Sequence, residues 1–153
     1  GDVDLAACRD LIAAAGPMSI TFHRAFDAVR DRQTALEALV GLGCKRVLTS
    51  GAHSSAPQGA TAIAAVVRQA AGRISVIAGA GIRPENVRQL VAATGVCEIH
   101  ASASAPRISP TSRRSAGLQG LDADWRETDA EAVRRLVDEL RAAESHAGST
   151  AKS

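Results

Sequence analysis

The stretch that decides the fold is "SITFH", residues 19–23, in which polar and apolar side chains alternate. In a strand, Ser19, Thr21 and His23 would lie on one face, and Ile20 and Phe22 on the other. One polar face fits a barrel whose helices ring the outside and whose lumen becomes polar toward the mouth. Strands covered by helices on both faces are apolar throughout. The alternation therefore favours a barrel over a doubly wound sheet.

The same kind of strand recurs along the chain. Four β-prone runs begin 28, 28 and 23 residues apart: "MSITF" at 18–22, "RVLTS" at 46–50, "ISVIA" at 74–78 and "CEIHAS" at 97–102. Apolar residues three and four apart predict one amphipathic helix in each gap, and another over residues 4–15. Glycines that follow the helical patterns predict short connections into the strands; they are Gly16, Gly43, Gly72 and Gly95. Helices alternating with single strands predict parallel pairing through right-handed crossovers.

The length sets a limit on this architecture. A (β/α)8 barrel needs about 250 residues, whereas this chain has 153. We expect an α/β fold, TIM-barrel-like, in which residues 1–143 form part of a barrel. Within it, residues 103–127 are expected to be a long mobile loop, followed by a helix with a Thr128–Glu131 capping box. Residues 144–153 are expected to be a disordered tail.

Composition excludes several function classes. The net charge is +2 and aromatic residues make up 2% of the chain, so no nucleic-acid surface is expected. No apolar run of eighteen residues or basic-then-apolar leader occurs, so we expect no membrane partner and a cytoplasmic location. Cys8, Cys44 and Cys97 lie far apart and read as small buried hydrophobes rather than a disulfide or zinc frame.

Polar residues and glycines follow all four predicted strands. The ligand face of parallel α/β folds lies at the carboxyl ends of the strands, so we expect a site there. Its candidate ligand-binding residues are His23, Arg24, Asp27, Thr49, Ser50, Gly51, Gly79, Gly81, His100 and Ser102.

His23 and Arg24 each have a structural alternative. His23 could act as an acid–base group or a metal ligand, or it could be hydrogen-bonded to a neighbouring loop; His100 in the equivalent place favours a site. Arg24 could hold an anion through its planar fork, or it could form a salt bridge to Asp27.

The stretch "GAGIRPENV", residues 79–87, combines two glycines with a helix start at Pro84. Its backbone N–H groups could bind an anion, or the glycines could serve only a tight turn. Arg46 and Glu98 lie at strand starts, where a structural role is expected.

The stretches "ITFHRAFD" (20–27), "CKRVLTSG" (44–51), "GAGIRPENV" and "CEIHASAS" (97–104) together resemble the CutC family. The resemblance covers roughly residues 1–143 and implies a TIM-barrel-like fold, copper homeostasis and copper ion binding. It identifies the chain with the second half of the family's barrel, hence with a fragment, and places the ten candidate residues at the shared mouth. Ala80 departs from the family's glycine, and Ser104-Ala105 stand where a basic residue is usual.

Copper chemistry agrees with these residues only in part. Soft thiolates suit Cu(I), yet none of the three cysteines is predicted at the mouth. His23 and His100 are therefore the candidate metal ligands, with copper as the possible cofactor.

Two rival functions remain open. One is a TIM-barrel enzyme of the lyase or isomerase type acting on a small anionic or phosphorylated metabolite, with His23 as the acid–base group. The other is a truncated fragment without independent activity, because half a barrel leaves two open strand edges. The expected partners are a small anion or metal ion and, in a homo-oligomer, a second copy.

Overall fold

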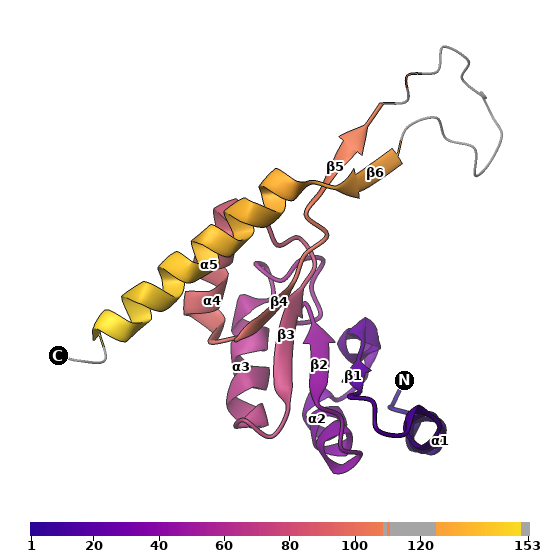
Figure 1. Ribbon diagram of the computed structural model, residues 1–153. Coiled ribbons are helices and arrows are strands. Elements are labelled where there is room, and N and C mark those ends of the chain that lie inside the picture. Colours follow the sequence, from indigo (N-terminus) through magenta and orange to yellow (C-terminus); the bar gives the residue numbers. More distant parts are fainter. Residues whose placement is uncertain (109, 111–124, 151–153) are drawn as a thin grey trace. The chain divides into compact units, whose positions relative to one another are not determined.

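The computed structural model describes residues 1–108, 110 and 125–150, with side chains described as far as residue 143. It forms two compact units, Gly1–Ala101 and Ser102–Ser153. The first unit contains, in chain order, α1 (Leu5–Ala15), β1 (Thr21–Phe22), the 3₁₀ helix η1 (Arg24–Ala28), α2 (Arg32–Gly41), β2 (Arg46–Thr49), α3 (Ala60–Ala70), β3 (Ser75–Gly79), α4 (Pro84–Thr94) and β4 (Glu98–His100) (Figure 1).

The four strands form one parallel sheet in the order β1-β2-β3-β4. Thr21 pairs with Arg46, Arg46 with Ser75, and Ile77 with Glu98. The α/β class and the parallel pairing are confirmed. The first strand is shorter than predicted because its partner β2 begins only at Arg46, so residues 18 and 19 have no strand to pair with.

The strands alternate between a covered face and an open face. Val47, Val76 and Ala78 are at most 5% exposed and contribute to the core with residues of the helices. Helix α3 packs against β3, and α4 packs against α3. Leu48 and Ile77, which alternate with these residues, are half-buried. The sheet is thus covered by helices on one side, as its sequence pattern indicates.

Polar caps and glycines set the helix ends. Asp4 accepts a hydrogen bond from Ala7 N at the start of α1, and Asp31 caps α2 in the same manner. Pro84 occupies the first turn of α4, where its missing N–H costs no helical bond. The four predicted helix-closing glycines all have positive φ; they are Gly16 (58°), Gly43 (79°), Gly72 (76°) and Gly95 (73°).

The second unit corrects three expectations. Strands β5 (Ser104–Arg107) and β6 (Trp125–Thr128) form an antiparallel pair where a mobile loop was expected, and residues 109 and 111–124 lie outside the described residues. Helix α5 (Ala130–Thr150) is capped by Asp129, which accepts a bond from Glu131 N, because Thr128 belongs to β6. The helix includes residues 144–150, expected to be disordered; residues 151–153 lie outside the description.

Candidate ligand-binding site

The carboxyl ends of β1 to β4 and the loops that follow them are called the mouth. It comprises residues 23–27, 49–59, 79–83 and His100. Nine of the ten predicted residues lie on these segments. Ser102 belongs to the second unit, where its hydroxyl contacts that of Ser104.

His23 caps the helix η1 with its own ring. The Ala25 N–H donates to His23 Nδ1 at 3.0 Å. An Nδ1 that accepts has no proton, so the neutral ring carries its proton on Nε2. The exposed His23 Nε2 is therefore a hydrogen-bond donor. A metal ion would require the lone pair that this tautomer lacks at Nε2.

Asp27 organises the loop after β2. Its carboxylate accepts hydrogen bonds from Thr49 Oγ1, Ser50 N, Ser50 Oγ and Ala52 N, and from Arg24 Nε at 3.0 Å. Only 9% of the side chain is exposed. Burial raises the pKa of Asp27, but the hydrogen bonds from Thr49, Ser50, Ala52 and Arg24 together bring it below its usual range. The charged carboxylate is the form that these donors stabilise.

Arg24 is held on two sides. Besides its bond to Asp27, its Nη2 donates to Ser50 Oγ at 2.6 Å and lies 3.4 Å from the His53 carbonyl oxygen. The Ser50 hydroxyl has one proton, which it gives either to Asp27 or to the His53 carbonyl. Nη1 has no hydrogen-bond partner among the described residues, and 43% of the Arg24 side chain is exposed. The guanidinium is fixed in place with one donor edge open to a ligand.

Backbone contact explains the glycines after β2. A Cβ on Gly59 would lie 1.9 Å from the Ser50 carbonyl oxygen, and a Cβ on Gly51 would lie 2.4 Å from the Gly59 oxygen. Gly51 and Ala52 also have positive φ, 71° and 59°, which turns the Ala52 N–H toward Asp27. Gly51 thus shapes the loop. Gly59, which the sequence pattern did not single out, is equally required.

The glycine that ends β3 and the one in the loop after it also meet protein atoms. A Cβ on Gly81 would lie 2.9 Å from Ser55 Cβ, and one on Gly79 would lie 2.7 Å from Leu48 Cδ1. The Gly81 carbonyl accepts a bond from Asn86 Nδ2. The Gly81 N–H has no partner among the described residues, and the residue is exposed. Gly79 therefore serves the close packing of β3 against Leu48 of β2, and Gly81 serves the close approach of the loops after β2 and β3. Gly81 also leaves one backbone donor available to a ligand.

The sheet order separates the two predicted metal ligands. His23 follows β1 and His100 ends β4, with β2 and β3 between them. Three strand spacings amount to roughly 14 Å across a sheet, whereas a metal–imidazole bond is about 2 Å long. Within one chain these two imidazoles do not meet at one ion. Among the described residues, no three His, Cys, Asp or Glu side chains gather as a metal site.

The cysteines do not supply a thiolate site at the mouth. Cys44 is 3% exposed, Cys8 is half-buried and Cys97 is exposed, which corrects the expectation that all three are buried. Burial raises the pKa of the Cys44 thiol, and the nearby Cys8 raises it further. A protonated thiol is a poor ligand for a soft metal.

His53 is a mouth residue that the sequence analysis missed. Its Nδ1 lies 2.8 Å from the Gly51 carbonyl oxygen, which can only accept, so Nδ1 carries the proton. In the neutral form of this exposed ring, Nε2 is an acceptor, and it has no hydrogen-bond partner among the described residues. The sequence prediction considered residues at the strand ends, whereas His53 lies further along the loop after β2, so its position gave no signal.

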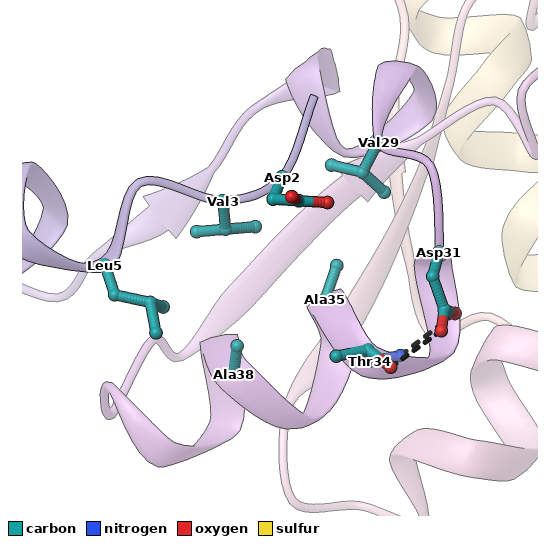
Figure 2. Close-up of a pocket in the computed structure, with 8 residues that line it drawn as sticks. All are labelled: Asp2, Val3, Leu5, Val29, Asp31, Thr34, Ala35 and Ala38. Carbon is teal, nitrogen blue, oxygen red and sulfur yellow. Dashed lines mark hydrogen bonds between the residues drawn. The ribbon is translucent and has the colours of Figure 1, made fainter.

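A pocket of about 200 Å³ lies apart from the mouth residues, between the N-terminal segment and α2 (Figure 2). Its lining is mostly apolar. Its two carboxylates already have partners, since Asp2 pairs with Arg30 and Asp31 caps α2. It offers a ligand less polar chemistry than the mouth.

Comparison with known proteins gives a consistent result. A family model described as the CutC family matches residues 1–105. A CutC family protein of Chromobacterium violaceum is 47% identical over 145 residues, covering 92% of this chain and 59% of the relative. One from Xanthomonas axonopodis pv. citri is 46% identical over 143 residues, covering 94% of this chain and 60% of the relative. The chain spans about 60% of the length of these relatives.

Solved structures extend the comparison to the fold. A CutC protein of Streptococcus agalactiae, named for copper homeostasis, matches with a TM-score of 0.62 and 30% identity, over 65% of this chain and 49% of that one. A structure named native KDPGal matches 94% of this chain and 57% of its own with a TM-score of 0.57. At 16% identity, this second match concerns the fold alone.

Proposed function

Because the chain belongs to the CutC family, we propose that it takes part in copper homeostasis and binds a small anionic ligand at the mouth. The family relationship supports the first part, since a solved relative is named for copper homeostasis. The second part is supported by one observation: Arg24 is fixed by Asp27 and Ser50 while its Nη1 stays without a partner among the described residues.

The donor groups of the mouth fit an anion better than a soft metal. The open guanidinium edge, the Gly81 N–H and the His23 Nε2–H are all donor groups on the mouth segments, without acceptors among the described residues. Charge-assisted bonds from a guanidinium are the strong ones for phosphate or carboxylate groups. We propose a phosphorylated or carboxylated metabolite as the ligand class.

A thermal scan tests the anion proposal. Phosphate that binds the folded chain raises its melting temperature with concentration, and Arg24→Gln should abolish this rise. Sodium chloride at the same ionic strength is the control for screening. A melting temperature that responds equally to phosphate and chloride contradicts the proposal.

The role in copper homeostasis is tested in cells. In a host without its own CutC protein, expression of this chain should change copper tolerance, and equal tolerance with and without the chain counts against the role. The cytoplasmic location is also a proposal, which fractionation of the same cells tests. Among the described residues, no helix has the length and apolar character needed to cross a membrane.

Direct copper binding is a separate proposal, with His23 and His100 as the ligands. Anaerobic titration with Cu(I) against a competing chelator measures the affinity. A fall in affinity in both His23→Ala and His100→Ala supports these ligands, and unchanged affinity removes them. The separation of the two histidines in one chain makes this the harder proposal to satisfy.

Catalysis of the lyase or isomerase type is a second candidate function, favoured by His53. The Nε2 of its neutral ring can accept a proton and has no partner among the residues that the structure describes. The backbone carbonyl of the same residue lies 3.4 Å from Arg24 Nη2. A ³¹P NMR screen of phosphorylated metabolites should show turnover that His53→Gln abolishes while phosphate binding persists. Turnover that survives His53→Gln excludes His53 as the base.

A further inference from the structure

Charged side chains are few on the mouth. Its segments carry one carboxylate, that of Asp27, and two guanidinium groups, those of Arg24 and Arg83. Arg24 and Asp27 form an ion pair with Nε and Oδ2 3.0 Å apart, and this pair has no net charge. Arg83 lies on a different loop, the one after β3. The charge that a ligand meets at Arg24 therefore depends on Asp27 as much as on Arg24 itself.

Asp27 and Ser50 together occupy one side of the Arg24 guanidinium. Nε donates to Asp27 Oδ2 at 3.0 Å, Nη2 donates to Ser50 Oγ at 2.6 Å, and these two oxygens lie 2.9 Å apart. They are placed as the two oxygens of a single carboxylate would be in a bidentate pair. Nη1, which has no partner among the described residues, lies on the remaining edge. A ligand bound to Nη1 would have Asp27 across the guanidinium from it.

The negative charge of Asp27 acts on such a ligand at short range. Burial raises the pKa of Asp27, but the hydrogen bonds that it accepts from Thr49 and its neighbours bring the pKa below its usual range, so the carboxylate is charged at neutral pH. A ligand oxygen on Nη1 would lie roughly 7 Å from this carboxylate, given ordinary hydrogen-bond lengths on both sides of the guanidinium. At that distance, repulsion between two unit charges changes an equilibrium by about threefold even at the dielectric constant of water.

A singly charged group fits these surroundings better than a doubly charged one. The first negative charge of a ligand is offset by Arg24, whereas a second charge is repelled by Asp27 and its lost hydration is not compensated. The Gly81 N–H and the neutral His23 ring add donor groups but no charge. We propose that Asp27 sets the charge of the ligand and that the group held by Arg24 is a carboxylate rather than a phosphate dianion, which binds there more weakly.

This inference rests on the proposed function, because it specifies the ligand class of the same site. The test compares three small anions at pH 8 and constant ionic strength, observed through the NMR signals of the Arg24 side chain. Acetate carries one charge, and methyl phosphate carries two because the second pKa of a phosphomonoester is about 6. Dimethyl phosphate is a phosphate with a single charge, so it separates charge from shape. The unchanged chain should bind acetate and dimethyl phosphate more tightly than methyl phosphate.

Two variants assign this preference to Asp27. Asp27→Asn nearly preserves the size of the side chain and removes its charge. In this variant, the affinity for methyl phosphate relative to dimethyl phosphate should rise by at least about threefold. Asp10→Asn removes an exposed carboxylate on α1, so it is the control for net charge and should leave that ratio unchanged. Melting curves identify a temperature at which both variants are folded.

The outcomes distinguish the inference from the proposed function. Tighter binding of methyl phosphate than of both monoanions to the unchanged chain overturns the inference and leaves the anion site in place. An unchanged ratio in folded Asp27→Asn does the same. If none of the three anions shifts the Arg24 signals along a saturable curve, the anion site itself is contradicted, and the inference with it. If Asp27→Asn loses all binding because Arg24 is displaced, the order of affinities in the unchanged chain still decides.

Discussion

Asp27 connects three segments of the first unit at the scale of single residues. It receives donors from β2, from the loop that follows, and from Arg24 on its own 3₁₀ helix. The Ser50 and Ala52 N–H groups of this loop already donate hydrogen bonds to the Asp27 carboxylate. Of the groups in this network, the outer edge of Arg24 is the donor that stays available to an external anion, and its orientation depends on Asp27.

Asp27→Asn should lower the free energy of unfolding by about 2 kcal/mol, because donors arranged for a charged carboxylate lose it. The lowered pKa means that this stability is present above the ordinary value of 3.8 and is lost as the pH falls through the folded-state value. Urea melts from pH 7 down to pH 2 measure it. A difference between the two proteins that does not shrink in acid contradicts the assigned role.

Gly59→Ala should cost at least about 3 kcal/mol, because its Cβ would overlap the Ser50 carbonyl oxygen and neither backbone segment can yield cheaply. Gly41→Ala is the matched control. Gly41 lies in α2, has nothing within 4 Å of an added Cβ, and should gain about 0.5 kcal/mol from helix propensity. Thermal melts compare the two. Similar losses in both would show that the close loop contact is absent.

At the scale of elements, α2 and α3 are joined by a polar clamp at their exposed surface. Arg73, just after α3, donates two hydrogen bonds to Glu37 of α2, at 2.7 and 2.9 Å. Gln69 donates to the same carboxylate. The hydrogen bonds from Arg73 and Gln69 lower the pKa of Glu37 from 4.5 to about 2.

Glu37→Gln should destabilise the chain at neutral pH, and the loss should diminish in high salt because both partners are half-exposed. The stability contributed by the Glu37 carboxylate is present above pH 4.5 and is lost as the pH falls toward 2. Chemical denaturation at pH 7 and pH 2 measures it. An equal loss at both pH values would assign the effect to packing rather than charge.

The sequence predicts the elements of the first unit well because local signals and burial agree there. The glycines predicted to follow the helices have positive φ, and Pro84 lies in the first turn of α4 as predicted. The alternation of the strands corresponds to one face covered by helices and one open face. Side-chain and backbone contacts within loops determine two features that the sequence pattern did not predict. The helix η1 depends on the His23 ring as its cap, and Gly59 meets the backbone of Ser50 and Gly51 at the other end of the loop after β2. The β5–β6 pair escaped prediction because Pro106 and the polar sequence around it do not indicate strands.

At the scale of the whole molecule, the sequence predicts which polar side chains lie at the strand carboxyl ends, but it does not predict the hydrogen-bond partners of each side chain. From the sequence, Arg24 could form either a salt bridge to Asp27 or a contact to an anion. In the structure it forms the salt bridge, and its Nη1 has no partner among the described residues. The tautomers of His23 and His53 depend on backbone groups that no sequence pattern specifies.

Titration of the ¹⁵N-labelled chain with inorganic phosphate, observed by NMR, tests whether the mouth binds an anion through Arg24. Binding at the mouth should shift the Gly81 amide and the Arg24 side-chain signals along one saturable curve. Arg24→Gln should lose the saturation, whereas Arg9→Gln, which removes an exposed charge on α1, should retain it. Shifts that do not saturate, or that persist unchanged in Arg24→Gln, would contradict an anion site built on Arg24.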